Sequence, residues 1–120
     1  MRNANMKGRY FIMEMTLRWY GSKFDTITLK QIRQIPGVKG VITTLYDTAP
    51  GEVWSRERIR AMKEEVAAAG LHVAAIESVN VHDAIKTGAK DRDMYIENYI
   101  KTLENLGKED IHLVCYNFMP

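Results

Sequence analysis

The apolar positions of this chain form short runs that alternate with amphipathic stretches. Within three stretches, apolar residues recur at the helical spacings of three and four. The runs between them are rich in Val, Ile and Thr, which favour β-strands. This alternation predicts seven elements in the order strand, helix, strand, helix, strand, helix, strand. The predicted strands span 15–20, 38–46, 71–77 and 111–118, the predicted helices span 28–35, 55–69 and 91–106, and a loop is expected at 78–90.

Local signals mark the ends of the predicted helices. Thr28 and Gln31 have the spacing of a capping box at the start of the first helix. Ser55 is a candidate N-cap of the second helix, and either Asp91 or Asp93 of the third. Glycine is expected to follow each helix, since it adopts the left-handed conformation of a C-terminal cap. The three glycines are Gly37, Gly70 and Gly107.

The alternation of strands and helices predicts parallel strands joined by right-handed crossovers. Strands two to four are nearly continuous apolar runs, as expected when helices cover a sheet. Two architectures share this pattern. One is an open doubly wound sheet, which 120 residues nearly complete. The other is a (β/α)8 barrel, which needs about 200–250 residues. The pattern alone favours the open sheet.

Composition narrows the class of protein. Hydrophobic residues make up 46% of the 120 residues and charged residues 27%, which is typical of one globular domain. The net charge of +2 gives no electrostatic reason to expect binding to nucleic acid or an anionic membrane. No apolar run reaches the roughly 18–20 residues that span a bilayer. The single cysteine, Cys115, cannot form an internal disulfide, which favours a cytoplasmic location.

The first 14 residues are polar and mixed, without the apolar stretch of a secretory signal. We interpret residues 1–14 as a disordered leader and residues 15–120 as the domain.

In both architectures, chemistry is expected at the carboxyl ends of the strands. Arg18 offers either a guanidinium fork for a substrate carboxylate or an ion-pair partner for Glu77 or Asp47. Glu77 ends an otherwise apolar strand, where it is a metal ligand, a general base or an anchor for an arginine. His82 follows in a loop, as either a proton-transfer group or a solvated side chain.

Other residues near the strand ends have weaker signals. Tyr20 is a candidate substrate contact, although packing is the commoner role of such an aromatic. Asn117 is suited to hydrogen-bonding a hydroxyl-rich ligand. Cys115 lies in an apolar strand and is interpreted as a buried core thiol. His72 and His112 lie early in their strands and are interpreted as structural.

Several catalytic motifs are absent from the sequence. It has no glycine-rich phosphate loop, no Cys/His cluster of the zinc type and no GxSxG elbow. The turn after the first strand holds a single glycine, Gly21, and therefore is not a dinucleotide fingerprint.

Several long segments, in order, resemble the opening of bacterial mannonate dehydratases. The resemblance runs from about Met15 to Pro120 and is far more specific than a single motif. The segments are MTLRWYG at 15–21, ITLKQIRQIPGVKGVITTLYD at 27–47, GEVW at 51–54, AAGLHVAAIESVNVHDAIKTG at 68–88, RDMYIENYIKTLENLG at 92–107 and VCYNFMP at 114–120.

The resemblance implies a (β/α)8 barrel of the xylose isomerase-like type, with about the first four strands in this chain, and replaces the open sheet as the expected fold. It also implies the dehydration of D-mannonate to 2-keto-3-deoxy-D-gluconate and a divalent metal, Fe²⁺ or Mn²⁺. Members of the family are much longer than this chain. Their metal ligands are expected outside it, so no metal ligand is assigned here, and Cys115 is not equated with the family's metal-binding cysteine.

From their strand-end positions, Arg18, Tyr20 and Asn117 are expected to orient the substrate in the intact enzyme. Glu77 and His82 are the candidates for proton transfer or for supporting it. Half a barrel leaves strand edges unpaired, so we expect the isolated chain to be inactive and either homo-oligomeric or poorly folded. Two alternatives remain: a related barrel isomerase or epimerase of sugars, and a non-catalytic α/β module for binding or assembly.

Overall fold

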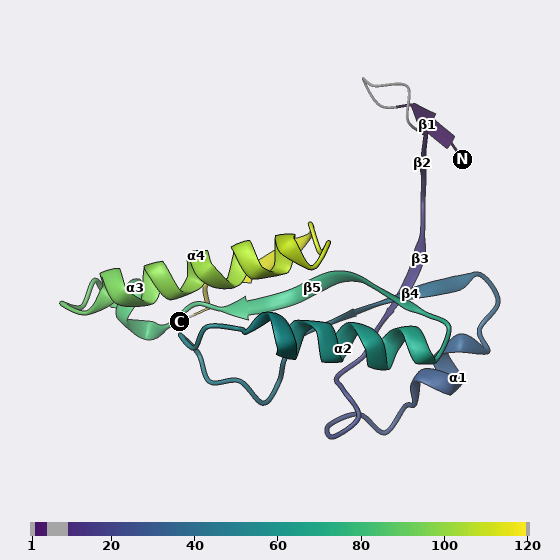
Figure 1. Ribbon diagram of the computed structural model, residues 1–120, viewed down its shortest axis with the longest axis horizontal. Coiled ribbons are helices and arrows are strands. Elements are labelled where there is room, and N and C mark those ends of the chain that lie inside the picture. The colour runs from purple at the N-terminus through teal and green to yellow at the C-terminus, as the bar shows by residue number, and fades with distance from the viewer. Residues whose placement is uncertain (1, 5–9, 120) are drawn as a thin grey trace.

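The computed structural model describes residues 2–4 and 10–119. From residue 15 on, strands and helices alternate as the pattern predicts, with one additional short helix at Asp83–Thr87 (Figure 1). The elements are β1 (Arg2–Ala4), β2 (Tyr10–Ile12), β3 (Met15–Arg18), α1 (Leu29–Arg33), β4 (Val38–Thr43), α2 (Arg56–Ala68), β5 (His72–Asn80), α3 (Asp83–Thr87), α4 (Arg92–Lys108) and β6 (Val114–Asn117).

Strands β3 to β6 form one parallel sheet in the order β3-β4-β5-β6. Each strand pairs with the next along the chain, so right-handed crossovers place the connecting helices on the same face of the sheet. Helix α1 contacts β4, and α2 contacts both β5 and α4. Within the described strands the order never reverses, unlike the two-sided winding of a doubly wound sheet. The described strands therefore lack the reversal on which the pattern-only preference for that sheet depends.

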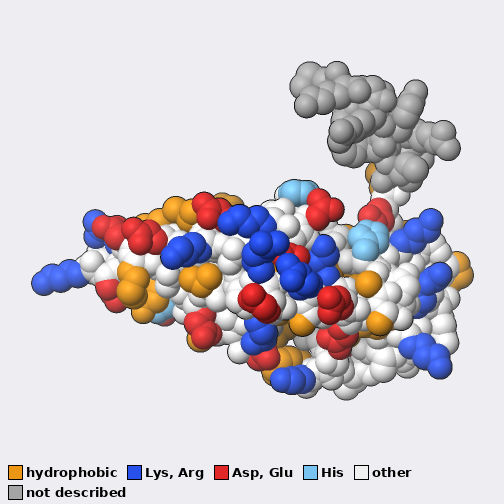
Figure 2. Space-filling model, in the orientation of Figure 1, with side chains coloured by type: hydrophobic (Ala, Val, Ile, Leu, Met, Phe, Trp, Pro, Cys, Tyr) orange, Lys and Arg blue, Asp and Glu red, His pale blue; other side chains and the backbone are white. Residues whose placement is uncertain are grey.

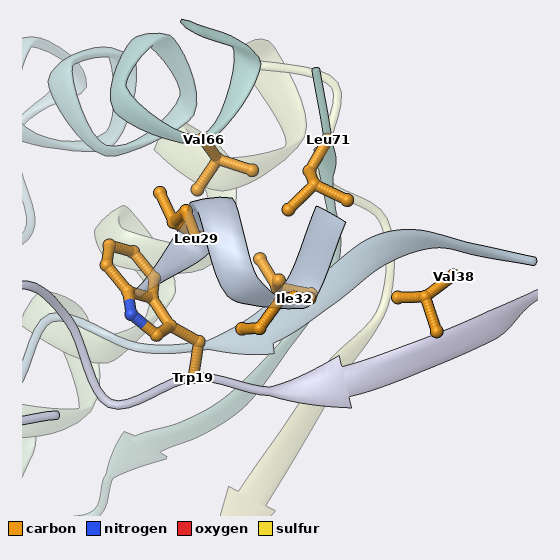
Figure 3. Packing of buried hydrophobic residues seen from close by; sticks show 7 residues of the cluster. Trp19, Leu29, Ile32, Val38, Val66 and Leu71 are labelled. Carbon is orange, nitrogen blue, oxygen red and sulfur yellow. The ribbon is translucent and has the colours of Figure 1, made fainter. Parts of the chain in front are cut away.

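The hydrophobic core lies between the sheet and its helix layer, in two clusters. Helix α2 links them, since Val66 belongs to the first cluster, and Ile59 and Met62 belong to the second. Burial of each large apolar side chain contributes about 1.5–3 kcal/mol to folding. The first cluster, drawn in Figure 3, comprises Trp19, Leu29, Ile32, Val38, Val41, Val66 and Leu71, and the second comprises Trp54, Ile59, Met62, Ile76, Val79, Leu106 and Ile111.

The helix caps confirm most of the local predictions. The Thr28 hydroxyl accepts a hydrogen bond from the Gln31 backbone N–H at 3.2 Å, and the Gln31 side chain accepts one from the Thr28 N–H at 2.8 Å. Ser55 accepts a hydrogen bond from the Arg58 N–H at 3.3 Å and so caps α2. Gly70 has a φ of 78°, in the left-handed region expected after that helix.

The end of the third predicted helix differs from expectation. Helix α4 continues through Gly107 to Lys108, and the left-handed residue that follows is Asp110, with a φ of 63°. The backbone N–H of Ile111 then donates to the Leu106 carbonyl at 3.0 Å. With the bond from the Asp110 N–H to the Gly107 carbonyl at 3.1 Å, these contacts form a Schellman cap in which Asp110 takes the left-handed position that was expected of Gly107. Asp91 holds the N-cap position, but its side chain makes no capping hydrogen bond.

Four strand boundaries also move. The first strand ends at Arg18 and the second at Thr43, both earlier than predicted, whereas the third extends to Asn80 and the fourth begins only at Val114. Apolar residues in a sequence indicate which part of the chain is buried. A strand, however, ends where the neighbouring strand no longer supplies hydrogen-bond partners. The predicted loop at 78–90 contains α3, which is too short to show a helical period.

The prediction of a disordered leader at 1–14 lies partly outside the described residues, which omit 1 and 5–9. In the described part of this range, β1 pairs with β2 in an antiparallel manner. The helices of the described chain include none with the length and hydropathy to cross a bilayer.

Candidate functional site

Arg18, the last residue of β3, is the centre of a polar cluster at the carboxyl side of the sheet. Its guanidinium forms an ion pair with Glu77 on β5, two strands away. The same guanidinium lies 4.4 Å from the centroid of the Tyr20 ring, within the range of a cation–π contact. The Arg18 side chain remains 47% exposed. Neighbouring groups therefore hold the cation in place while part of it stays accessible.

Tyr46, which follows β4, is the fourth member of this cluster. Its hydroxyl approaches Arg18 and is the main cause that raises the pKa of that arginine, with Glu77 adding to the effect. Burial raises the pKa of the Tyr46 hydroxyl, and the Arg18 cation opposes part of this shift. The hydroxyl is buried, yet it has no partner in hydrogen-bond geometry among the described residues. Tyr46 therefore stays protonated at neutral pH, with its buried hydroxyl close to the Arg18 guanidinium.

The loop after β3 positions the aromatic rings of the cluster. The Asp25 carboxylate accepts hydrogen bonds from the Tyr20 N–H at 2.9 Å and the Ile27 N–H at 2.8 Å. These two bonds lower the pKa of Asp25, so the carboxylate is ionised and the loop is fixed at neutral pH. The Tyr20 and Tyr46 ring centroids lie 5.4 Å apart, and those of Phe24 and Tyr46 6.1 Å apart.

A cavity of about 180 Å³ is lined by Tyr20 and Tyr46 of the cluster and lies between the ends of β3 and β4 and the middle of α2. Asp47, in its wall, forms an ion pair with Arg58 and lies 3.7 Å from the Lys23 ammonium. The hydrogen bond from Arg58 is the main cause of the lowered pKa of Asp47. Of the two acids considered as partners for Arg18, the structure therefore selects Glu77.

His82 and Asn117 lie apart from the Arg18 cluster. Both line a second cavity of about 410 Å³, together with Asn80 and Lys86. The Asn117 side-chain oxygen accepts a hydrogen bond from the Met119 N–H at 3.2 Å. Of the five candidate residues, three meet in one cluster and two at this cavity.

His82 has two structural contacts. Its Nδ1 accepts a hydrogen bond from the Ala84 N–H at 3.0 Å, which caps α3. Its ring stacks on Tyr95 with centroids 3.6 Å apart and an interplanar angle of 7°. Because Nδ1 is occupied as an acceptor here, Nε2 is the ring nitrogen left for any contact with a ligand.

Tyr46 was missed as a site residue from the sequence. The signal was present, because Tyr46 and Asp47 end the second apolar run, just as Arg18 ends the first. A polar or aromatic residue at that point of a parallel sheet meets the ends of the neighbouring strands.

The interpretation of Cys115 as a buried core thiol was wrong, because the side chain is exposed on β6. This strand pairs with only β5 among the described strands, so its apolar residues are not all covered. His72 and His112 contact single carboxylates, at 2.7 Å to Glu14 and 2.8 Å to Asp110.

The described residues contain no group of three or more His, Cys, Asp or Glu side chains that could hold a metal ion. Glu77, the carboxylate nearest the cluster centre, is already paired with Arg18. These residues therefore do not by themselves fit an Fe²⁺ or Mn²⁺ site.

Comparison with known proteins decides the family. The family model for D-mannonate dehydratase (UxuA) matches residues 13–120. The chain belongs to the D-mannonate dehydratase family. The resemblance seen in the sequence is therefore confirmed.

Individual relatives agree with this assignment. The mannonate dehydratase of Brachyspira hyodysenteriae is 67% identical over 108 residues, and that of Thermotoga maritima is 58% identical over the same length. Each match covers 90% of this chain and 30% of the relative. A crystal structure of mannonate dehydratase from Streptococcus suis serotype 2 superimposes with a TM-score of 0.87 and 46% identity, over 92% of this chain and 31% of that one. The chain thus spans about 30% of the length of the curated relatives it matches.

Proposed function

We propose that this chain forms the amino-terminal part of a D-mannonate dehydratase, which removes water from D-mannonate to give 2-keto-3-deoxy-D-gluconate. Family membership over residues 13–120 is the observation that carries the proposal. The reaction removes the proton at C2, beside the substrate carboxylate, and the hydroxyl at C3. Negative charge develops on the carboxylate during proton removal, so a fixed cation beside it lowers the barrier.

The Arg18 cluster supplies such a cation. In the proposal, the exposed part of the Arg18 guanidinium binds the substrate carboxylate, and the buried Tyr46 hydroxyl holds the guanidinium from behind. Glu77 holds Arg18 from the adjoining strand, and Tyr20 supports the guanidinium from one side. Glu77 is thereby a positioning residue. His82 and Asn117 keep their assignments as candidates for proton transfer and substrate orientation, at the second cavity.

We further propose that the whole protein is a (β/α)8 barrel of the xylose isomerase-like type, and that further strand and helix units follow β6. Two observations support this. Each edge strand of the sheet has one neighbour among the described strands, and the sheet order never reverses. The outward face of α4 is apolar but exposed, unlike its buried Leu106. The exposed apolar side chains on α4 and β6 include Ile96, Ile100, Leu103 and Tyr116.

The family resemblance supports a requirement for Fe²⁺ or Mn²⁺, a cytoplasmic location and a homo-oligomeric state. A divalent metal would stabilise the enediolate as a Lewis acid. Its ligands come from outside the described residues in this proposal, because those residues hold no cluster that fits it.

The test is D-mannonate turnover, measured anaerobically with Mn²⁺ or Fe²⁺. The 120-residue chain is compared with a chimera in which residues 13–120 replace the matching segment of the Brachyspira hyodysenteriae enzyme, 67% identical to it. We expect 2-keto-3-deoxygluconate from the chimera and none from the chain alone. A folded chimera without product contradicts the proposal. Sugar isomerisation in its place would point to the alternative enzyme class, and metal-independent self-association without turnover would point to an assembly module.

A further inference from the structure

Three contacts fix the ring of His82. Its Nδ1 accepts the hydrogen bond from the Ala84 N–H at 3.0 Å. One face of the ring stacks on Tyr95 of α4, with the centroids 3.6 Å apart and the rings nearly parallel at 7°. The Cδ2 edge of the ring lies against the backbone of Gly51, since a Cβ at that residue would fall 3.0 Å from Cδ2. These contacts set the orientation of the imidazole and leave Nε2 as its remaining nitrogen.

Gly51 lies close to both rings of this stack. A Cβ at this position would be 2.5 Å from Tyr95 Cδ1, which is closer than real side chains approach. Its φ of 86° lies in the left-handed region, which glycine adopts without strain. The Gly51 carbonyl accepts a hydrogen bond from the Asn98 side chain at 3.0 Å. Tyr95 and Asn98 lie one turn apart on α4, so a single helix holds both the His82 ring and the loop that packs against it.

Capping a helix does not by itself require this arrangement. Ser, Thr, Asp and Asn are the usual N-cap residues, and none of them needs a ring stacked on it. His82 also lines the cavity of about 410 Å³ near the ends of β5 and β6, together with Asn80 and Asn117. A group that transfers a proton must be held within hydrogen-bond distance of its substrate, and a small misplacement costs much of the rate. The stack and the glycine contact restrict the rotation that would misplace Nε2.

We propose that Tyr95, together with Gly51, is a positioning residue that holds His82 Nε2 at this cavity for proton transfer. The inference rests on the proposed function, in which His82 is a candidate for proton transfer. Tyr95 is not among the residues that line the cavity, so it acts through His82 and not on the substrate. The face of its ring is what matters, and its hydroxyl is not needed. Gly51 acts through its lack of a side chain, which lets the loop approach both rings.

Variants of two tyrosines on α4 test the stack in the Brachyspira chimera. Tyr95→Leu removes the stacked ring and should lower kcat for D-mannonate by about tenfold, with KM changed by less than about twofold. Tyr95→Phe keeps the ring and should keep the kcat of the parent. Tyr99→Leu removes another half-buried ring from the same helix and is the control. It should lower the thermal midpoint without lowering kcat.

Two glycines provide a second matched pair. Gly51→Ala adds a methyl group against the rings of Tyr95 and His82, whereas Gly37→Ala adds one at a similar φ of 83° with no atom within 4 Å. Both variants strain the backbone and should lower the thermal midpoint. Only Gly51→Ala should also lower kcat, by about tenfold, because only it displaces the stack.

A double variant separates positioning from a purely structural role. His82→Asn keeps an acceptor for the Ala84 N–H, because asparagine is a good N-cap, but it removes Nε2. It should lower kcat at least as much as Tyr95→Leu does. Adding Tyr95→Leu to His82→Asn should then lower kcat no further, since Tyr95 acts only through His82.

The His82 ring also reports the stack without turnover. In a chimera labelled with ¹³C at histidine Cε1, the His82 signal is the one lost in His82→Asn. The ring current of Tyr95 should move its proton upfield, and this displacement should disappear in Tyr95→Leu and persist in Tyr95→Phe and Tyr99→Leu.

The outcomes distinguish this inference from the proposed function. A folded parent chimera without turnover contradicts the proposed function and the inference with it. In a working chimera, full kcat in Tyr95→Leu or in His82→Asn overturns the inference alone. Equal losses from Tyr95→Leu with and without His82 also overturn it, because they show a structural role. If Tyr95→Leu does not fold, the glycine pair decides, and equal kcat in Gly51→Ala and Gly37→Ala overturns the inference.

Discussion

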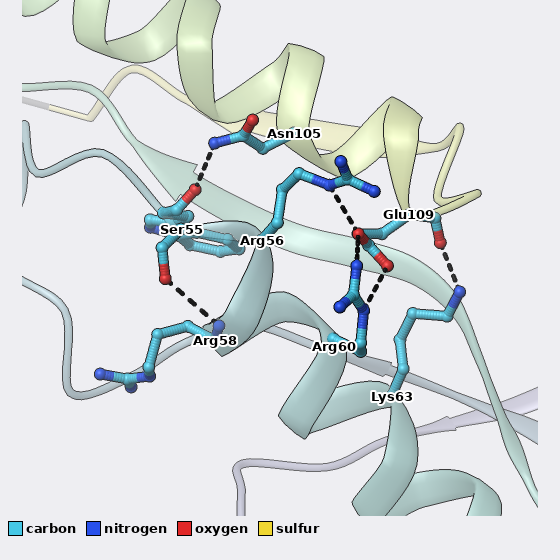
Figure 4. A network of polar contacts seen from close by, with 8 residues as sticks. Ser55, Arg56, Arg58, Arg60, Lys63, Asn105 and Glu109 are labelled. Atoms are coloured by element: carbon cyan, nitrogen blue, oxygen red, sulfur yellow. Dashed lines mark hydrogen bonds and ion pairs between the residues drawn. The ribbon is translucent and has the colours of Figure 1, made fainter.

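Two arginine–glutamate contacts in this molecule have the same chemistry but different surroundings. Glu77, at the carboxyl side of the sheet, pairs with the single Arg18 and is 32% exposed. Glu109, in the helix layer, is 9% exposed and contacts two arginines, with Arg56 Nε at 2.7 Å and Arg60 at 2.9 Å (Figure 4). The Lys63 ammonium also donates to the Glu109 backbone carbonyl.

The two contacts differ in how much of the arginine charge remains accessible to a ligand. The charges of Glu109 and its arginines are used to join α2 to the end of α4, within the Lys, Arg, Asp and Glu side chains that gather over these helices in Figure 2. Arg60 and then Arg56 lower the pKa of Glu109 from its ordinary 4.5 to about 2. Arg18 shares one carboxylate, remains half exposed and lies beside an unpartnered hydroxyl. The charges of the Glu109 contact are thus used within the fold, whereas the Arg18 guanidinium keeps the exposed surface that the proposed substrate site requires.

The largest expected effect is in the core beside Glu109. Leu106 is fully buried, and its carbonyl accepts the Glu109 N–H at 3.1 Å. Leu106→Ala should lower the free energy of unfolding by about 2–5 kcal/mol, because it leaves a cavity in the core. Leu103→Ala on the same helix, at a side chain 39% exposed, is the control and should change it by about 0.5 kcal/mol or less. Urea unfolding measures both; equal losses would show that another chain covers this face of α4.

The second largest effect is expected when the Arg18 guanidinium is removed. In the chimera, Arg18→Ala should lower kcat/KM for D-mannonate by more than about tenfold, or about 1.4 kcal/mol, with little change in thermal midpoint. Arg56→Ala is the matched control, because it also removes an arginine from a glutamate contact. It should leave kcat/KM unchanged and lower the thermal midpoint. Unchanged kinetics in Arg18→Ala would remove that residue from the site.

The pH dependence of stability tests the contribution of the Glu109 charge. The folded state lowers the pKa of Glu109, so its contribution to stability is complete above pH 4.5 and is lost as the pH falls through about 2. Glu109→Gln should therefore lower the urea midpoint most at neutral pH, and the gap to the parent should narrow toward pH 2. A gap that stays constant from pH 7 to pH 2.5 would show that the charge of Glu109 is not what joins the helices.

The smallest effect is expected at Glu77. Glu77→Gln should change the free energy of unfolding by less than about 1 kcal/mol, as for other partly exposed ion pairs. Because Glu77 positions Arg18, the same variant should raise KM in the chimera by up to about fivefold with little change in kcat. A loss of kcat larger than that of Arg18→Ala would instead make Glu77 a participant in proton transfer.

Local signals in the sequence predicted the structure correctly where the interaction spans only a few residues. The capping box at Thr28 and Gln31 and the serine cap at Ser55 form as expected, because each bond spans only three residues. By contrast, no sequence signal indicated that Glu109 binds Arg56 and Arg60, about fifty positions earlier. From the sequence, Glu77 was one of two possible partners for Arg18. The choice between them depends on the register of β3, β4 and β5.

Taken alone, the sequence determined the alternation of strands and helices, the family and the side of the sheet where polar groups collect. These follow from apolar periodicity, from matched segments and from the common direction of parallel strands. Only the tertiary structure decided that Arg18 takes Glu77 rather than Asp47, that Tyr46 joins them, that Cys115 is exposed and that His82 caps a helix. Each of these depends on which distant residues the sheet register and the helix packing bring into contact. The order of residues along the chain does not specify those contacts.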